Sequence, residues 1–364
     1  MFMEGDVRIP SGCAISGIIN RKRRSFSGTK IIDSIAVMHD RSNGLGGGFA
    51  AYGIYPEYKN HYAFHMFFDS LQAKEEVERF FNSHFAVDLS GRIPTRKVCG
   101  IGRGPILWRY FMTPLEDKLR DAELSADEYV AQCVMKINSC YKGAFVASSG
   151  KNMGAFKAVG FPEDVGEYYR LDEYSGYIWT AHGRFPTNTP GWWGGAHPFT
   201  LLDWSVVHNG EISSYDANRR YLEMFDYQCT LQTDTEAITY TFDLLLRKHG
   251  LPLDLAVKTV AAPFWESIDR MDEQEKRVVK ALRTTYSSLL INGPFSIILG
   301  SKNGFMALND RLKLRSLVAA EDKEELYVAS EEAAIRAVCA NPEKVWSPQG
   351  GEPIIGLLEG VESL

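Results

Sequence analysis

A small set of side chains, spread along the sequence, could together attack an amide carbonyl and hold its substrate. Cys13 offers a thiol nucleophile at the start of an apolar run that is typical of a buried strand. Asn209 offers a side-chain NH2 and Gly210 a backbone N–H, the two kinds of donor that build an oxyanion hole. Arg184 offers a planar fork for a carboxylate, and Asp234 offers a carboxylate for an ammonium group. A ligand with one carboxylate, one ammonium group and one side-chain amide is glutamine.

Each of these signals also has a plain structural explanation. Free cysteine is among the residues most often buried, so Cys13 could simply begin a core strand. The segment "RFPTNTPGWWGG", which begins at Arg184, could be a turn-rich loop. The stretch "HNGE" suits a two-residue hairpin turn, and "TDTE" suits a helix start with Thr233 or Asp234 as N-cap. The chemical interpretation therefore depends on whether the fold brings the set together.

The elements that must position this set are predicted from apolar periodicity. Strands are predicted for "CAISGIIN", "GGFAAYGIY", "HYAFHMFFD", "GAFVASSG", "GAFKAVG", "YIWTAHGRF", "WSVVHNGEI", "FSIILGSKNGFMALND" and "ELYVASEE". Helical patterns cover residues 30–39, 70–85, 125–140, 234–249, 253–285 and 331–339, and serines open the second and third. Strands at both ends with helices between them favour an α+β sandwich. Residues 59–173 are interpreted as an insertion into that sandwich or a subdomain on it.

Composition and charge exclude several other classes of protein. The chain of 364 residues has a net charge of −6 at pH 7, unlike proteins that grip nucleic acid or anionic lipid. The basic run "RKRR" at residues 21–24 is interpreted as a solvated turn. The six cysteines form no CxxC pair or metal-ligand cluster, so no metal site is predicted. No secretory signal and no membrane-spanning run is visible, which predicts a cytoplasmic protein with reduced thiols.

Several motifs, taken in their order along the chain, resemble one known family. Cys13 with "AISGI", then "HDRSNGLGGGFAAYG", "HGRFPTNT", "AHPF", "HNGEI" and "TDTE", is similar to the class II glutamine amidotransferases. That family has the N-terminal-nucleophile hydrolase fold, which implies a four-layer αββα sandwich for this α+β chain. The likeness is greatest to the glutaminase domain of glutamate synthase, in the form encoded as a separate subunit. The stretches "ALNDRLKLRSL" and "YVASEEAAI" also resemble late strands of that family.

The resemblance implies a role for each residue of the set. Cys13 becomes the nucleophile, which forms a thioester with the substrate. Arg184 becomes the clamp on the glutamine α-carboxylate, and Asp234 becomes the partner of the α-ammonium group. Asn209 and Gly210 become the oxyanion donors.

Three further residues enter through the resemblance alone. Arg41 in "HDRSNG" matches an arginine near the nucleophile that helps to order the site. The following "SNGLGGG" departs from the commoner "RGPDGAG" type of sequence, which weakens that match. His182 and His197 flank the glutamine pocket in this pattern, and for each a structural role is favoured over proton transfer.

In this family the base is the free α-amine of the nucleophilic residue itself. An α-amine has a pKa of about 8 and a thiol of about 8.5, so each can exchange a proton near neutrality. While Gly12 is attached, the nitrogen of Cys13 is an amide and cannot serve as a base. Residues 1–12 are therefore predicted to be a removable propeptide, followed by one amidotransferase domain over residues 13–364. Gly12 has no side chain to obstruct attack on its carbonyl, which suits self-cleavage through the thiol.

No cofactor is predicted in this chain, because the sequence has no evident phosphate-binding loop, flavin-binding barrel or cysteine cluster. The resemblance implies that FMN and an iron–sulfur centre reside on a separate glutamate synthase subunit, which passes the ammonia to 2-oxoglutarate. Partners other than glutamine and that subunit, such as nucleic acid or a membrane, are not expected. Two alternatives stay open: a glutaminase component for another acceptor, such as an amino-sugar or nucleotide synthase, and an unprocessed glutamine-binding module that does no chemistry.

Overall fold

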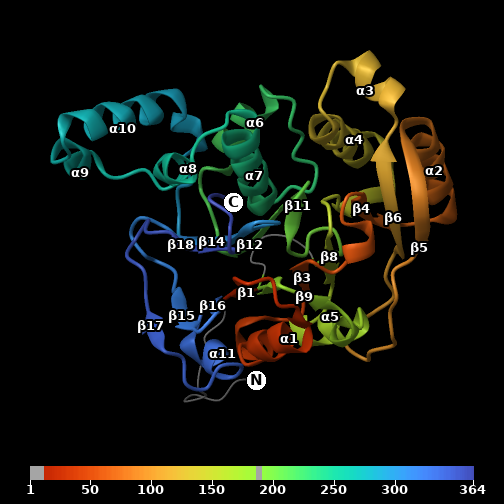
Figure 1. Ribbon diagram of the computed structural model, residues 1–364, viewed down its shortest axis with the longest axis horizontal. Helices are drawn as coiled ribbons and strands as arrows, with labels where there is room; N and C mark the ends of the chain where they lie inside the picture. Colours follow the sequence, from red (N-terminus) through yellow and green to blue (C-terminus); the bar gives the residue numbers. More distant parts are fainter. Residues whose placement is uncertain (1–11, 186–190) are drawn as a thin grey trace, which may run out of the picture.

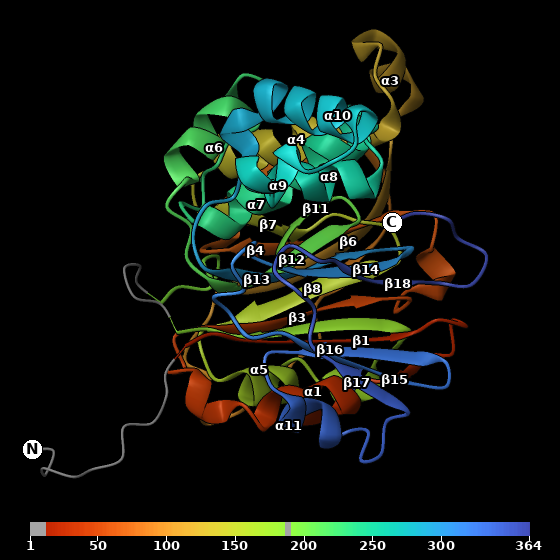
Figure 2. The same cartoon turned by 90° about the vertical axis from the view of Figure 1, so that its left-hand side faces the viewer.

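Two antiparallel sheets lie face to face between two layers of helices in the computed structural model, which describes residues 12–185 and 191–364 (Figures 1 and 2). The seven-stranded sheet runs, in spatial order, β17 (Lys344–Trp346), β15 (Val318–Asp322), β16 (Glu325–Ala329), β1 (Ala14–Asn20), β10 (Ile178–Gly183), β3 (Gly47–Tyr52), β8 (Met153–Ala158). The five-stranded sheet runs β11 (Phe199–Leu201), β12 (Trp204–Gly210), β13 (Phe295–Ser301), β14 (Gly304–Asn309), β18 (Ile354–Leu357). This arrangement confirms the predicted α+β sandwich of four layers.

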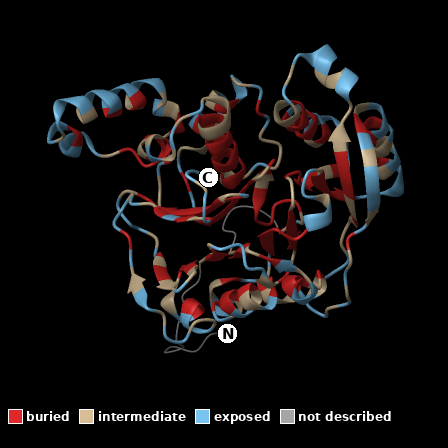
Figure 3. Ribbon diagram, viewed as in Figure 1, coloured by how far each residue is buried: buried red, intermediate tan, exposed pale blue. Residues whose placement is uncertain are grey.

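Helices cover the outer face of each sheet (Figure 2). The seven-stranded sheet is covered by α1 (Thr29–Ala36), α5 (Pro162–Tyr168) and α11 (Glu332–Arg336). The five-stranded sheet is covered by α6 (Tyr215–Glu223), α7 (Asp234–Phe242), α8 (Leu253–Val260), α9 (Trp265–Asp269) and α10 (Glu273–Thr285). Figure 3 shows buried residues along the strands of both sheets and mainly exposed ones along α10. The core therefore lies within the sandwich, as the apolar runs predict.

The two sheets pack closely where β1 crosses the five-stranded sheet. Ile15 and Ile19 of β1 and Val207 and Ile298 of the facing sheet are all fully buried in one apolar cluster. At Gly17, between the two isoleucines, a Cβ atom would lie 3.0 Å from the Cδ1 of Ile298. The absence of a side chain at this position lets the two sheets approach each other closely at β1.

Residues 59–173 contribute a third sheet beside the sandwich (Figure 1). It runs β5 (Phe85–Arg92), β6 (Ile106–Pro114), β4 (Tyr62–Phe68), β7 (Ala144–Ser148), and it is accompanied by α2 (Leu71–His84), α3 (Glu116–Ala122) and α4 (Ala126–Cys140). The predicted serine N-caps are confirmed, because Ser70 accepts from the N–H of Ala73 and Ser125 from that of Glu128. The same segment also supplies β8, the edge strand of the seven-stranded sheet. A two-stranded ribbon of β2 (Phe26–Ser27) and β9 (Ser175–Gly176) completes the sheets of the described chain.

Two predicted helical regions are subdivided in the structure. The region 234–249 is α7 followed by a π-helix over Asp243–Lys248. The region 253–285 is three helices, because Pro263 lacks the N–H that a continuous helix needs and Asp272 begins a new helix as its N-cap. Among the described helices, none is long and apolar enough to span a bilayer.

Candidate active site

The pairing of β1 with β10 places the predicted nucleophile beside the predicted carboxylate clamp. The antiparallel register sets Ala14 opposite Gly183, so Cys13 and Arg184 leave the sheet together at the same end. The sulfur of Cys13 accepts a hydrogen bond of 3.3 Å from the backbone N–H of Phe185. The aliphatic part of the Arg184 side chain has room because Gly46 carries no side chain: a Cβ there would lie 3.0 Å from the Cδ of Arg184.

A cavity of about 220 Å³ opens at this end of the sandwich. Its lining includes Cys13, Arg184, Gly210 and Asp234, which come from four different segments of the chain. Asn209 is fully buried directly beside the cavity lining, at the residue before Gly210. The fold therefore brings together the residues that the sequence predicts as a chemical set. They are not merely separate turns, caps and strand ends in different parts of the molecule.

Asp234 is held as a carboxylate at the start of α7. Thr233 is the N-cap, since its side chain accepts from the N–H of Glu236. The Oδ2 atom of Asp234 accepts from the N–H of Ile212 at 3.1 Å, and the hydroxyl of Thr235 donates to Oδ1 at 3.2 Å. Burial raises the pKa of Asp234, but these donors and the imidazole ring of His208 outweigh that effect. The pKa of Asp234 therefore lies below its usual value. A charged carboxylate is therefore available for an ammonium group at neutral pH.

Asn209 and Gly210 end β12 without forming a hairpin turn. The alternative of a two-residue turn is wrong, because β12 pairs with β13, whose first residue, Phe295, lies far along the chain. Gly210 has φ +148°, and a Cβ there would lie 2.1 Å from the carbonyl oxygen of Pro294, so only glycine suits the position. The Nδ2 of Asn209 donates to Ser330 at 3.2 Å, and its Oδ1 is buried with no partner in the described part of the chain.

Arg41 contacts the backbone on both sides of Cys13 from the short 3-10 helix His39–Arg41. Its Nε donates to the carbonyl of Cys13 at 3.2 Å, and its own carbonyl accepts from the N–H of Gly12 at 3.1 Å. Its Nη1 also pairs with Glu331 at 2.7 Å. Arg41 lies outside the lining of the cavity. These contacts place it to order the Cys13 backbone, and it does not face the space in which a substrate would lie.

Of the two predicted histidines, His197 lines the cavity and His182 packs against its ring. His208, which sequence reasoning missed, is a second histidine of the lining. The rings of His182 and His197 stack with centroids 3.8 Å apart. His182 contacts the carbonyl of His208 at 2.9 Å, and His197 contacts the hydroxyl of Thr235 at 2.8 Å. Burial lowers the pKa of His182 to about 3 and that of His197 well below its ordinary value. Both rings are therefore neutral near pH 7, which suits a structural role. The hydroxyl of Thr235 joins His197 and His208 to Asp234, and Thr235 was not predicted from the sequence.

The thiol of Cys13 is protonated near neutral pH. Burial raises its pKa above the ordinary value, although the Phe185 N–H and the guanidinium groups of Arg184 and Arg315 act to lower it. Sequence reasoning missed Arg315, although it lies within the quoted stretch "ALNDRLKLRSL". Its Nη1 lies 3.9 Å from the position that a Cβ on Gly12 would occupy. Because the buried thiol is not ionised, attack on an amide requires a base close to the sulfur.

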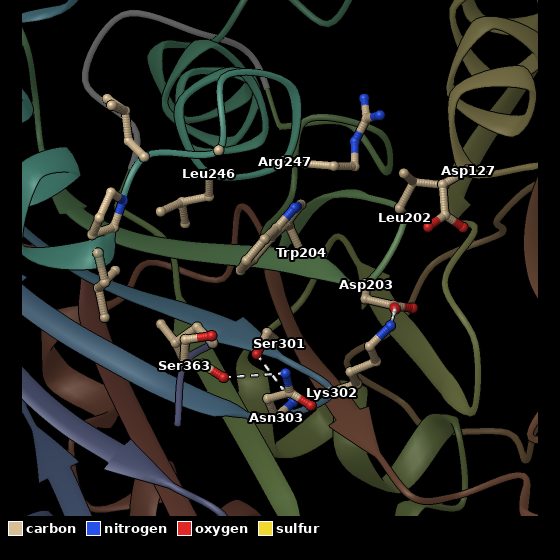
Figure 4. Close-up of a pocket in the computed structure, with 15 residues that line it drawn as sticks. Asp127, Leu202, Asp203, Trp204, Leu246, Arg247, Ser301, Lys302, Asn303 and Ser363 are labelled. Atoms are coloured by element: carbon tan, nitrogen blue, oxygen red, sulfur yellow. Dashed lines mark hydrogen bonds and ion pairs between the residues drawn. The ribbon is translucent and has the colours of Figure 1, made fainter. Parts of the chain in front are cut away.

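A second cavity, of about 410 Å³, lies at the opposite end of β12 and is drawn in Figure 4. Its charged groups are paired within the chain: Lys302 with Asp203 at 3.0 Å, and Arg247 with Asp243 at 2.7 Å. Asn303 reaches across it to the carbonyl of Ser363 at 3.1 Å (Figure 4). The residues that line it include no cysteine or histidine among those described. The smaller cavity at Cys13 is therefore the candidate active site.

Comparison with known proteins shows the family to which the chain belongs. The family model "Glutamine amidotransferases class-II" matches residues 101–347. An uncharacterized protein of Archaeoglobus fulgidus is 52% identical over 353 residues, which cover 96% of this chain and 93% of that protein. A putative glutamine amidotransferase of Methanothermobacter thermautotrophicus is 30% identical over 209 residues, 56% of this chain and 59% of that protein. The solved glutamine phosphoribosylpyrophosphate amidotransferase from B. subtilis is 14% identical with a TM-score of 0.48, covering 97% of this chain and 49% of that one.

The family match includes most of the predicted site and most of the chain. Arg184, Asn209, Gly210 and Asp234 lie within residues 101–347, whereas Cys13 precedes them. The described residues contain no group of histidine, cysteine and carboxylate side chains that could hold a metal ion. On the extent of the family match, the chain belongs to the class II glutamine amidotransferases.

Proposed function

We propose that this chain hydrolyses the side-chain amide of glutamine to glutamate and ammonia, through a thioester on Cys13. The observation that carries the proposal is the cavity that a thiol, a guanidinium group and an ionised carboxylate line together. Its volume of about 220 Å³ suits a ligand of the size of one amino acid. The guanidinium, the carboxylate and the thiol in one cavity match the α-carboxylate, the α-ammonium group and the side-chain amide of glutamine.

The roles follow from the chemistry of each side chain. The guanidinium of Arg184 binds the α-carboxylate of glutamine, and the carboxylate of Asp234 binds the α-ammonium group. The side-chain amide then lies at the sulfur of Cys13. As the thiol adds to the carbonyl carbon, negative charge develops on the carbonyl oxygen, and the backbone N–H of Gly210 with the Nδ2 of Asn209 stabilises it. One hydrogen of that Nδ2 is bonded to Ser330, which leaves the second for the oxyanion.

The proton of the thiol goes to the α-amine of Cys13, which cleavage of the Gly12–Cys13 bond makes available. The amine accepts the proton as sulfur attacks and returns it to the departing ammonia. Water then hydrolyses the thioester and releases glutamate, with the same amine as base. Arg41 keeps the Cys13 backbone in position through its bond to the Cys13 carbonyl. Of the proposed propeptide 1–12, residues 1–11 lie outside the described chain.

We propose further that the ammonia serves a glutamate synthase, whose separate subunit carries FMN and an iron–sulfur centre. This finer proposal is supported by the order of motifs in the sequence, from Cys13 to the stretch "YVASEEAAI". In this account the chain itself needs no cofactor. Co-purification of the chain with a flavoprotein from its native source would favour it over another acceptor enzyme.

The test is the release of glutamate from glutamine by the isolated chain, measured together with the intact mass of the protein. Hydrolysis by chains that begin at Cys13 supports the proposal. Glutamine binding without hydrolysis, by a chain that retains residues 1–12, favours the alternative of a regulatory binding module. If the chain neither binds nor hydrolyses glutamine, the assignment of the Cys13 cavity to glutamine is overturned.

A further inference from the structure

A third cavity, of about 670 Å³, lies at the other end of the seven-stranded sheet from Cys13. Cys13 precedes β1 and Arg23 follows it, and the seven residues of β1 span about 23 Å when extended. The lining comes from the turns that follow β1 and β3, from β6 of the third sheet, and from the segment before β10. The cavity therefore lies where the segment 59–173 meets the sandwich, and it is separate from the glutamine cavity.

Arg109 of β6 provides a half-buried positive charge in this cavity. Its Nη1 lies 3.5 Å from the hydroxyl oxygens of Tyr55 and Tyr174, at the long limit of a hydrogen bond. Its guanidinium carbon lies 5.5 Å from the centre of the Tyr55 ring. Within the described part of the chain, no carboxylate lies within ion-pair distance of Arg109. The polar groups that contact the Arg109 guanidinium are the uncharged phenols of Tyr55 and Tyr174.

The neighbouring hydrogen bonds explain why Tyr55 remains neutral. The carbonyl of Ala155 lies 3.0 Å from the Nδ1 of His65, so that nitrogen carries the proton and the Nε2 is an acceptor. The hydroxyl of Tyr55 therefore donates to this Nε2 over 2.9 Å. Burial lowers the pKa of His65 to about 4 and raises that of Tyr55 above its usual value. Nothing in this group neutralises Arg109 at physiological pH.

Arg23 adds a second unneutralised charge at the rim of the cavity. It belongs to the basic run at residues 21–24, whose other three members pair with carboxylates of β15 and of the turn that follows it. Arg23 instead donates to the carbonyl of Glu359 at 3.0 Å, and no carboxylate pairs with it among the described residues. Three of the four residues of this run, Lys22, Arg23 and Arg24, are exposed, in line with a solvated turn, and Arg23 also lies at the rim of the cavity.

The acidic residue in the lining does not compensate these charges. Glu173 lines the cavity, but its carboxylate pairs with Arg170 at 2.6 Å and with Arg96 at 3.2 Å. In the cavity of Figure 4, by contrast, each cation has a carboxylate of its own. The third cavity thus combines two guanidinium groups that have no counter-ion with the hydroxyl donors of Tyr174 and Ser25.

We propose that this cavity binds a small molecule through an oxyanionic group, either phosphate or carboxylate, that contacts Arg109 and Arg23. A partly buried charge is unfavourable without a counter-ion, and guanidinium groups bind both kinds of oxyanion in bidentate fashion. The tyrosine hydroxyls add neutral donors at the same place. The volume exceeds that of one anionic group, so the remainder of the molecule packs on the rings of Tyr174 and Tyr177. This site goes beyond the proposed glutaminase function and does not depend on it.

The experiment is calorimetric titration of the full chain with inorganic phosphate and, separately, with citrate, in a low-salt buffer without other oxyanions. Saturable binding of one anion but not the other identifies which oxyanion the site accepts. Arg109→Gln should weaken binding at least about tenfold, since it removes a charge-assisted contact. Arg23→Gln, on an exposed turn, gives the same readout with little effect on folding, and Arg109→Lys preserves the charge.

Arg103→Gln is the matched control, because Arg103 is exposed and lies outside the cavity lining. It should leave the affinity for phosphate or citrate unchanged. Arg184→Gln separates this site from the glutamine cavity and should also leave the affinity unchanged. The proposal is overturned if neither anion binds at millimolar concentration. It is equally overturned if binding survives both Arg109→Gln and Arg23→Gln, disappears only in Arg184→Gln, or falls as much in Arg103→Gln.

Discussion

The sulfur of Cys13 accepts a hydrogen bond from the backbone N–H of Phe185 across 172 residues of sequence. This contact follows from strand pairing, because Ala14 opposite Gly183 brings the two chain segments out of the sheet together. A slip of one residue in that register would move the side chains of β1 to the opposite face of the sheet. Cys13 would then no longer lie beside Arg184. The β1–β10 pair is therefore the element that creates the site, and the remaining residues are added around it.

Loss of the Asn209 amide should slow hydrolysis far more than it weakens substrate binding. Asn209→Ala removes one oxyanion donor, which corresponds to a fall in kcat of roughly 10²–10³. Steady-state kinetics of glutamate release measure this change. Ser330→Ala is the comparison variant, since it keeps the amide of Asn209 but removes the hydroxyl that accepts from its Nδ2 and from the N–H of Ile15. A fall of less than tenfold in Asn209→Ala would rule out its role as an oxyanion donor.

Removal of the charge on Asp234 should weaken the binding of glutamine. Asp234→Asn keeps the shape of the side chain but removes the partner of the α-ammonium group. An ionic hydrogen bond of about 1.5–3 kcal/mol corresponds to a rise in KM of roughly 10- to 100-fold. Asp203→Asn, in the separate cavity of Figure 4, is the control and should leave KM unchanged. An unaltered affinity in Asp234→Asn would show that another group binds the ammonium.

Arg315, which is not among the site residues predicted from the sequence, should lower the pKa of the Cys13 thiol. Arg315→Gln removes a positive charge that favours the thiolate of Cys13, so the pKa of the thiol should rise. The pH dependence of Cys13 alkylation by iodoacetamide measures this shift. Lys313→Gln removes a charge from the same turn but does not act on the thiol, and its profile should match the parent protein. Superimposable profiles for Arg315→Gln and the parent would contradict the assignment.

Lys157 should give the protein a distinctive dependence of stability on pH. It is 1% exposed, and its Nζ donates to the carbonyls of Gly194 and Pro198 at 3.0 and 3.2 Å, beside the cavity wall. Burial lowers its pKa to about 7, against about 10.4 in the unfolded chain. Between these values the unfolded chain binds more protons, so the free energy of unfolding rises with pH, by up to about 1.4 kcal/mol per unit.

Lys157→Met should remove that rise, because the variant has no group to protonate on unfolding. Chemical denaturation at pH values between 7 and 10 compares the two proteins. Burial raises the pKa of Glu236 to about 7, and the charge of Lys157 acts to lower it, so Glu236 would titrate differently in the two proteins. Glu236→Gln is therefore introduced into both proteins before they are compared. Equal slopes of unfolding free energy against pH would show that the Lys157 pKa is not depressed.

The sequence predicts those features that local patterns determine. The N-caps at Ser70 and Ser125 and the buried strand after Cys13 follow from residue type and periodicity, and all three are present. The strand β5 escaped prediction because its exposure does not alternate: it forms the outer edge of the third sheet and is largely exposed. β6 beside it was missed as well, although it is the centre of that sheet's pairing with β4.

The site residues also fall into two groups: those that sequence motifs identify, and those that only tertiary contacts reveal. The order of motifs named Cys13, Arg184 and Asp234, which the fold then brings to one cavity. Arg315 was not found because its closeness to Gly12 depends on how the turn after β14 packs against the chain before β1. Thr235 was missed since its contact with His197 arises only when α7 is laid over the five-stranded sheet. Such contacts depend on tertiary packing, which single motifs do not encode.

The most direct test compares two forms of the same chain for glutamate release from glutamine. In one form a cleavable fusion liberates Cys13 as the N-terminal residue, and in the other residues 1–12 remain attached, each verified by intact mass. We expect hydrolysis only in the form that carries the free α-amine, because the buried thiol needs that base. Equal rates in a chain that still begins at Met1 would contradict the account.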